Sequence, residues 1–461
     1  MDRKITFSLL ILIITNSISM SQNFGNWTLT DSLKDIRINS ASIDLADGNI
    51  LVSGGADENI LKSSEIYDYK TNKWRLTDSM NVPRYNHCLI RLNNGNILAV
   101  AGNSATCEIF DPIKEEWSLT DSLNYKVNGG NTVTLLNDGN VLEVGGSCFI
   151  GKKNFSPQIC EIYDVETGKW HDTDSIQIDI YEHSATKLLD GRVLIVGGFS
   201  KSKKSEVNNC ELYDPSAGKW TDAAPLNIGR QGHTATLLKD GRVLVCGGNN
   251  QSELHPNSCE LYDPINNTWT MVGSTFYFRY YHTAVLLDNG FLFIAGAGIK
   301  PWELYDVNNF KQYYHGDYPG DSGEVPGTLI NKLPNGEVLV AGGAVPYLAY
   351  WKITKTCYLY IPTVTGIVEK QNLIDSYNLY QNYPNPFNPA TTIMYELPKQ
   401  DFVILKIFDS VGREISTLIN CYQSAGVYSI NFDGSQFPSG VYFYTLFIKG
   451  FNKTKKMILI K

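Results

Sequence analysis

Short apolar runs, each set off by turn residues, recur along most of the chain. The run at 338–340 is apolar without a break, which is typical of a strand buried on both faces. An Asp-Gly or Asn-Gly pair, a strong β-hairpin signal, precedes many of these runs. Examples are Asp47-Gly48, Asn94-Gly95, Asp138-Gly139, Asn289-Gly290 and Asn335-Gly336. The pattern predicts an all-β chain built from short hairpins.

One unit recurs about seven times. The segment from His233 to Gly248 matches the segment from His183 to Gly198 nearly residue by residue. A Gly-Gly doublet, or a weakened form of it, ends at Gly55, Gly102, Gly146, Gly198, Gly248, Gly296 and Gly343. The intervals of 44 to 52 residues match the period of propeller blades, each with four strands.

The tryptophans indicate how the ring of units closes. A fourth strand with a tryptophan ends the first five units, at Trp74, Trp117, Trp170, Trp220 and Trp269. Phe310 stands where we expect the sixth, and the seventh unit stops after its third strand at Tyr360. The N-terminal segment at Trp27 closely copies the one at Trp117. We therefore expect the N-terminal strand to complete the last blade and pair its open edge.

With their Gly-Gly doublets, spaced tyrosines and tryptophans, these units resemble the kelch-repeat family over about residues 24–361. The resemblance implies a seven-bladed kelch-type β-propeller, to which we assign residues 22–361. Kelch propellers serve as protein-binding, carbohydrate-binding and, less often, enzyme domains. The fold therefore leaves the function open.

After an expected linker at 362–376, residues 377–461 follow another pattern. Strands predicted at 403–408, 427–432 and 441–447 favour a small immunoglobulin-like β-sandwich. The segment resembles the C-terminal sorting domain of the type IX secretion system of Gram-negative bacteria. Matching residues include Pro384, Asn385, Pro386, Phe387, Asn388, Pro389, Lys455 and Lys456. The resemblance implies the secretion machinery as a partner and a secreted or outer-surface location; the alternative is a sandwich kept for its own function.

The N-terminus reads as a signal peptide over residues 1–21. Arg3 and Lys4 precede a short apolar run at 5–14, and small residues lie before Gln22. No other segment approaches the ~20 apolar residues of a membrane-spanning helix. The formal net charge of −8 argues against a nucleic-acid partner, which would require a basic surface.

The chain has nine cysteines. Four of them recur at one repeat position, at Cys107, Cys160, Cys210 and Cys259, and we interpret these as small core residues. Export permits disulfides, and Cys148 with Cys160 is the alternative pairing that the spacing favours.

Variable loops on a rigid scaffold are the usual place for binding, which directs attention to the loops between blades. Arginine and tyrosine there suit carboxylates, sugars or peptides. The candidate ligand-binding residues are Arg84, Tyr85, Tyr181, Arg230, Arg279 and Tyr280. We expect a binding module for an extracellular glycan or protein. The alternative for the arginines is a structural role, pairing with a neighbouring blade.

A recurring histidine stands at the start of strand one, at His87, His183, His233 and His282. Recurrence once per blade favours a structural hydrogen bond over a metal site. The Tyr281-His282 pair resembles that of copper-radical oxidases, but the remaining ligands of that family have no match. We find no complete catalytic motif and expect no cofactor. The alternative function is a carbohydrate-active enzyme, of the sugar epimerase or mutarotase type or the copper-radical oxidase type, that uses the propeller mouth.

Overall fold

The computed structural model describes residues 25–150, 153–250, 257–296, 300–319, 327–347, 350–362, 377–379, 381–382, 385–397, 401–423 and 426–461. The chain divides into two compact units, Met1–Thr363 and Val364–Lys461. The expected signal peptide and nearly all of the expected linker lie outside the described residues. Within the described ranges, no helix meets the length and apolarity that a bilayer crossing requires.

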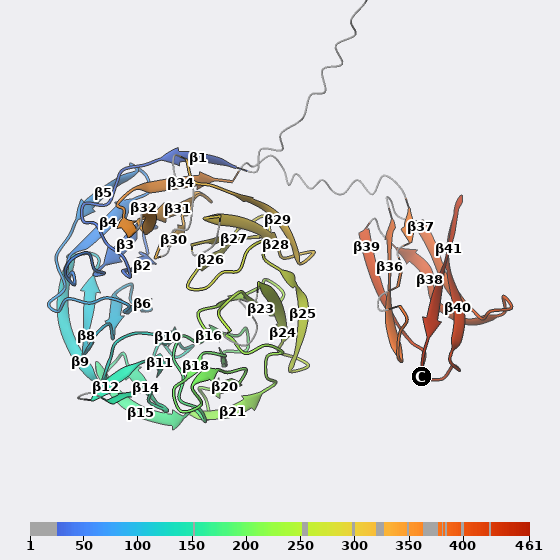
Figure 1. Ribbon diagram of the computed structural model, residues 1–461, viewed down its shortest axis with the longest axis horizontal. Helices are drawn as coiled ribbons and strands as arrows, with labels where there is room; N and C mark the ends of the chain where they lie inside the picture. The colour runs from blue at the N-terminus through green and yellow to red at the C-terminus, as the bar shows by residue number, and fades with distance from the viewer. Residues whose placement is uncertain are drawn as a thin grey trace, which may run out of the picture. The chain divides into compact units, whose positions relative to one another are not determined.

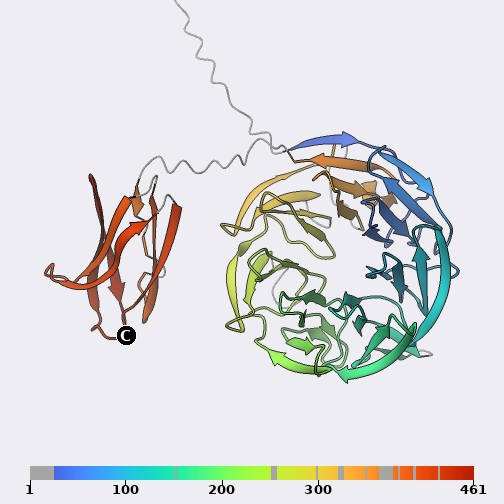
Figure 2. The same cartoon turned by 180° about the vertical axis from the view of Figure 1, so that it is seen from behind.

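The described part of the first unit contains seven antiparallel blades arranged in a ring (Figures 1 and 2). Six are four-stranded sheets, and β12 and β13 extend the sheet of blade two to six strands. Blade one has β2 (Ala41–Asp44), β3 (Ile50–Ser53), β4 (Ser64–Asp68) and β5 (Lys73–Leu76). Blade two has β6 (Cys88–Arg91), β7 (Ile97–Val100), β8 (Ser104–Asp111) and β9 (Glu116–Val127). Blade three has β10 (Asn131–Leu135), β11 (Val141–Gly145), β14 (Ile159–Asp164) and β15 (Lys169–Ser175).

Blade four has β16 (Ser184–Lys187), β17 (Val193–Val196), β20 (Cys210–Asp214) and β21 (Lys219–Ala223). Blade five has β22 (Thr234–Leu237), β23 (Val243–Cys246), β24 (Ser258–Asp263) and β25 (Thr268–Ser274). Blade six has β26 (Thr283–Leu286), β27 (Phe291–Ala295), β28 (Trp302–Asp306) and β29 (Lys311–Gly316). Blade seven has β30 (Leu329–Lys332), β31 (Val338–Ala341), β34 (Cys357–Ile361) and β1 (Asn26–Leu29).

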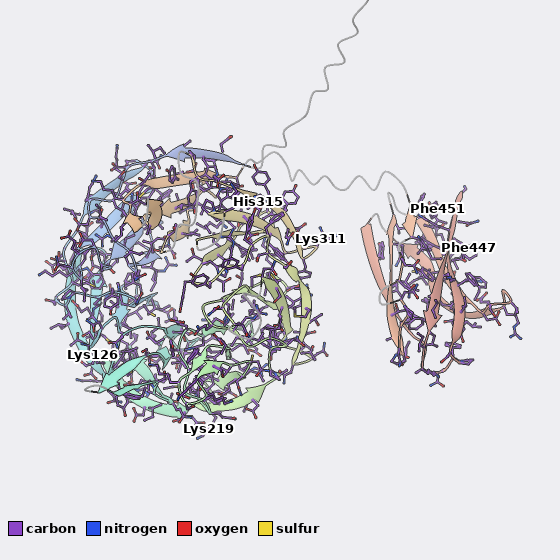
Figure 3. All side chains as sticks on the ribbon, viewed as in Figure 1. Lys126, Lys219, Lys311, His315, Phe447 and Phe451 are labelled. Atoms are coloured by element: carbon purple, nitrogen blue, oxygen red, sulfur yellow. The ribbon has the colours of Figure 1, made fainter. Side chains whose placement is uncertain are left out.

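The innermost strand of each blade contacts that of the next, and β30 contacts β2, so the ring is closed. The N-terminal strand β1 completes blade seven as expected, with Trp27 opposite Tyr360. Five aromatic rings surround the Trp27 indole at centroid distances of 5.1 to 6.2 Å: Phe293, Trp302, Tyr318, Tyr358 and Tyr360. The outermost strands carry exposed lysines such as Lys219 and Lys311 on the outer circumference (Figure 3).

The prediction for the sixth tryptophan position was wrong. Gln312 faces Tyr305 in blade six, just as Trp220 faces Tyr213 in blade four. Phe310 instead lies two residues earlier, in the turn, with a φ of 52°. Phe310 and Gln312 are only two residues apart, so Phe310 was assigned to the strand although it belongs to the turn that precedes it.

The apolar second strands form the core between blades, as their sequence predicts. Every residue of β17, β23 and β31 is buried. The Gly-Gly doublet that follows allows a close approach by the loop leading into the next blade. A Cβ on Gly247 would lie 2.6 Å from the carbonyl oxygen of Arg279, and the φ of Gly247 is +64°. Glycine therefore stands here for steric reasons.

Three further hairpins extend connections between second and third strands. They are β12 (Cys148–Ile150) with β13 (Lys153–Phe155), β18 (Phe199–Ser200) with β19 (Ser205–Glu206), and β32 (Ala344–Tyr347) with β33 (Tyr350–Ile353). Because antiparallel strands alternate in direction, these connections lie on the same face as the loops between blades. The variable segments therefore share one face, which we call the loop face.

The second unit has two antiparallel sheets. One contains β35 (Asn378–Leu379), β36 (Ala390–Leu397) and β39 (Gly426–Asp433). The other contains β37 (Asp401–Phe408), β38 (Glu414–Gln423), β40 (Gly440–Ile448) and β41 (Phe451–Leu459). Side chains from both sheets share one apolar core, as in a β-sandwich.

The proline-rich motif packs against the last strand of this sandwich. Phe387 is buried in the core, and its backbone N–H donates to the Ile458 carbonyl at 2.9 Å. The Asn385 side-chain oxygen accepts the Ile458 N–H at 2.9 Å. Lys456 is exposed on β41. The motif and the C-terminal tail therefore form one structural element, although Pro384 lies outside the described residues.

Candidate ligand site at the propeller mouth

The predicted arginines lie inside the propeller. Arg84, Arg230 and Arg279 have no exposed surface, and each forms an ion pair with a buried glutamate of the third strand of its own blade. The glutamates are Glu108, Glu260 and Glu303. The three arginines are thus positioned as structural residues rather than as ligand contacts, and they act within one blade rather than across to a neighbour.

The Arg230 site illustrates the complete bonding of these groups. The guanidinium donates to the carbonyl oxygens of Gly247 at 2.6 Å and Ser258 at 3.0 Å, and to Glu260 at 2.8 Å. Glu260 also accepts backbone N–H groups of the preceding loop, from Asn227 at 2.8 Å. One buried ion pair thereby fastens the loop face to the strands, and its hydrogen bonds offset the cost of burying both charges.

The recurring histidines are also structural. In blades four to six the histidine Nε2 lies 2.9 Å from the hydroxyl of Thr132, Ser184 or Thr234 in the preceding blade. Burial lowers the pKa of His183 and of His282 to about 3, so both rings are neutral at ordinary pH. Among the described residues, no group of three His, Cys, Asp or Glu side chains is placed to hold a metal ion.

A ring of left-handed backbone positions lies just before the innermost strands. Its members are Asn39, Asn86, Gly130, Glu182, Gly232, Tyr281 and Gly327, with φ values from 51° to 73°. Successive members are joined across blades: the Gly232 N–H donates to Glu182 O at 2.9 Å, and the Tyr281 N–H donates to Gly232 O at 2.8 Å. We call this set the mouth ring.

Glycine and asparagine are the residues that tolerate this conformation best, and five of the seven positions have one of them. Glu182 and Tyr281 are the two exceptions. A left-handed conformation costs such residues about 1–2 kcal/mol. Backbone strain of this kind clusters at functional sites, which makes these two positions candidates for function.

The two exceptional side chains bond to each other. The Tyr281 hydroxyl donates to the Glu182 carboxylate across Gly232, the ring position that lies between them. Burial raises the pKa of the Glu182 carboxyl, and Tyr281 and Lys201 act against that rise. Burial and the nearby carboxylate raise the pKa of the Tyr281 hydroxyl, which keeps its proton for this bond. Tyr281 is nevertheless 51% exposed.

Aromatic side chains surround this bond. Tyr280 meets Tyr281 edge-on at 5.4 Å between ring centroids and stacks with Phe278 at 6.4 Å. Tyr181 packs against Phe199 of β18 at 5.5 Å, and the Lys201 ammonium lies 4.9 Å from the Tyr181 ring centroid. The mouth therefore offers aromatic surface beside one carboxylate and one ammonium. We call Tyr181, Glu182, Lys201, Tyr280 and Tyr281 the mouth cluster.

Of the predicted site residues, the structure thus brings Tyr181 and Tyr280 together. Tyr85 is half-buried before β6, in another blade. Glu182 was not predicted as a site residue, Tyr281 was named only in its pair with His282, and Lys201 was not selected. For the first two a signal existed: they interrupt a position that is otherwise glycine or asparagine in every blade.

A concave region lies beside the β12–β13 hairpin. Tyr125, Phe155, Pro157 and Ile176 line part of a groove of about 400 Å³, and the Tyr125 and Phe155 rings meet edge-on at 5.8 Å. Its described lining residues include no ionisable group apart from Tyr125. The groove is the alternative position for a ligand on the loop face.

The family models match both units. The Kelch motif matches residues 40–81, 188–227 and 233–275, which correspond to blades one, four and five. The secretion system C-terminal sorting domain matches residues 381–461. The sequence has no match among curated proteins.

Solved structures with a similar fold include a fungal alcohol oxidase of the AA5 family in complex with copper. It aligns with a TM-score of 0.62 at 11% identity, covering 95% of this chain and 100% of its own. The structure of YjhT aligns at 14% identity and a TM-score of 0.49, covering 62% of this chain and 99% of its own. At these identities the first likeness shows the fold alone, and the second is too weak to support an argument.

Proposed function

Because the chain is a kelch-repeat protein with a type IX secretion C-terminal sorting domain, we propose that its exported propeller binds an extracellular glycan at the mouth cluster. The protein is secreted or held at the cell surface, where glycans are abundant ligands. The observation that carries the proposal is the Tyr281–Glu182 bond, made by the two mouth-ring residues that depart from the Gly or Asn pattern.

The chemistry of the cluster fits a sugar. Aromatic rings stack against the C–H faces of pyranose rings, and the exposed parts of Tyr280 and Tyr281 supply such surfaces. The Glu182 carboxylate accepts sugar hydroxyl groups, which form stronger bonds with a charged acceptor than with a neutral one. The half-buried Lys201 ammonium, which donates to Ser147 Oγ at 2.7 Å and to Phe155 O at 3.3 Å, adds a positive charge beside Tyr181. A protein ligand is the competing possibility, which the test distinguishes.

The test is a glycan array and a protein array probed with the mature protein, followed by titration of the best ligand against variants. Glu182→Gln and Tyr281→Phe remove the charge or the hydroxyl and retain the shape. We expect each to lower affinity by about 10- to 100-fold, as loss of a charge-assisted hydrogen bond does.

Tyr125→Ala, in the groove beside β12–β13, is the matched control and should bind like the wild type. The reverse result, with Tyr125→Ala defective and Glu182→Gln normal, would move the site to the groove. Binding only on the protein array would reject a glycan ligand. Turnover of the bound sugar would make the propeller a carbohydrate-active enzyme instead.

A further inference from the structure

Five blades have a cysteine at one position of the third strand. They are Cys107, Cys160, Cys210, Cys259 and Cys357, all buried. In blades four and seven the facing residue has no thiol: Val196 lies opposite Cys210, and Ala341 lies opposite Cys357. Blade five differs, because Cys246 lies directly opposite Cys259. The repeat explains one of these two cysteines but not the other.

The backbone register at this pair suits a covalent bond. The Gly247 N–H donates to Ser258 O at 3.3 Å, so residues 247 and 258 form a hydrogen-bonded pair, and Cys246 with Cys259 forms the adjacent non-hydrogen-bonded pair. In such a pair the Cα atoms lie about 4.5 Å apart and the side chains approach closely. That separation falls within the range of about 4.4–6.8 Å seen for disulfides.

The two thiols share one environment. Both side chains point to the same face of the sheet and belong to one apolar cluster, fully removed from solvent. Both sulfurs are free thiols in the structure, as are Cys148 and Cys160, whose pairing the spacing had favoured. The Cys148–Cys160 alternative has no comparable support, because these residues lie in different sheets.

We propose that Cys246 and Cys259 are joined by a disulfide in the exported protein. The two thiols lose two protons and two electrons to a disulfide-bearing oxidant met outside the cytoplasm, which leaves as a dithiol. Burial raises the pKa of the Cys246 thiol in the folded blade, which disfavours the reactive thiolate there. The bond therefore forms while the β23–β24 hairpin is still exposed, before blade six packs against it.

The bond has a structural consequence for the mouth. It closes the base of the connection at 247–258, on the loop face. Asn249 in that connection exchanges backbone hydrogen bonds with Gln231, at 2.8 and 3.1 Å. Gln231 precedes Gly232 of the mouth ring. The disulfide would thus restrain Gly248 and Asn249, next to Gln231 and the mouth ring, and this is so whether or not a glycan is the ligand.

The chain offers a simple readout. After Arg242 the next lysine or arginine is Arg279, so one tryptic peptide contains Cys246, Cys259 and no other cysteine. The exported protein is denatured with an alkylating agent and no reductant, then digested. We expect this peptide to be unalkylated and lighter by two hydrogens, and to take up two alkyl groups only after reduction. Two alkyl groups without reduction would overturn the proposal.

Two matched variants extend the test to the folded protein. Cys246→Val copies the residue of blade four and removes the pair, whereas Cys210→Val removes a buried thiol whose partner is Val196. We expect a reductant to lower the melting temperature of the wild type and of Cys210→Val by about 3–6 °C. Cys246→Val should not respond. An equal response from all three proteins would contradict the assignment.

Discussion

Arg230 and Glu260 form an ion pair with no exposed surface, in which the guanidinium Nη2 lies 2.8 Å from the carboxylate. The same pair recurs in blades one, two and six. Four of seven blades therefore contain a buried charge pair at the point where the loop face joins the strands. Blades three and four keep the glutamate, as Glu161 and Glu211, but have no arginine at the paired position. A buried glutamate with its arginine and one without it lead to different predictions.

Arg230→Ala should lower the free energy of unfolding by about 3–5 kcal/mol, because it leaves the Glu260 carboxylate buried without its counter-charge. Urea denaturation followed by tryptophan fluorescence measures the loss. Arg192→Ala is the control: Arg192 pairs with Asp190 at 2.7 Å on the surface, and exposed pairs contribute at most about 1 kcal/mol. Equal losses for both variants would contradict the assigned role of the buried pair.

Glu211→Gln should change the pH dependence of stability. Ile180 stands where an arginine would pair with Glu211, and burial raises the pKa of this carboxyl to about 7. The folded state therefore favours the protonated form. The stability that the protonated Glu211 carboxyl gives the folded state is fully present below the unfolded pKa of about 4.3. It is lost as the pH rises through about 7.

Relative to the wild type, Glu211→Gln should thus gain stability on going from about pH 5 to about pH 8, by up to about 3 kcal/mol. Melting temperatures across this range measure the effect. Glu260→Gln, at the equivalent position but facing Arg230, should be destabilised at both pH values. A wild-type pH profile in Glu211→Gln would show that this carboxyl does not titrate in the window.

Glu182→Asn should separate stability from binding. Asparagine stands at the equivalent mouth-ring positions Asn39 and Asn86, and it adopts a positive φ more readily than glutamate. We expect no loss of stability, and a gain of up to about 1 kcal/mol, together with loss of ligand affinity. Thermal unfolding and the titration described for Glu182→Gln measure the two effects. A clear destabilisation would mean that the Tyr281 bond contributes more than the backbone strain costs.

Trp27→Ala should open the last blade. The partly buried Trp27 indole packs against five aromatic rings, and removal of a tryptophan from aromatic packing costs about 3 kcal/mol or more. Leu29→Ala on the same strand removes a side chain that is 70% exposed, and it should change stability by no more than about 0.5 kcal/mol. Denaturation midpoints of the two variants test the strand's role in closure.

The ring itself was predictable because its determinants are local. The Asp-Gly turns, the apolar second strands and the Gly-Gly doublets each specify backbone geometry within a few residues, and the orphan Trp27 strand matches the vacancy beside Tyr360. The position of Phe310 was less predictable. Moving the start of the fourth strand by two residues hardly changes the residue pattern of the unit, so the sequence does not distinguish Phe310 from Gln312 as the strand position.

The candidate site was less predictable for a different reason. An arginine in a loop reads as exposed, and only the folded blade shows that Glu260, thirty residues later, draws Arg230 inside. The Tyr281–Glu182 bond joins residues 99 positions apart and depends on the curvature of the ring across Gly232. Their departure from the Gly or Asn pattern was visible in the sequence, but its meaning required the φ values.

The register that pairs Asn26 with Ile361 puts the entry and the exit of the propeller chain on neighbouring strands of one blade. Joining these two ends and cutting the chain in another inter-blade loop would leave every sheet intact. A circular permutant opened in the loop between β21 and β22 should therefore assemble the same ring, with the present β1–β34 pairing carried as an ordinary covalent hairpin. Its closure would then rest on the packing of blade four against blade five, because no blade would contain strands from both ends.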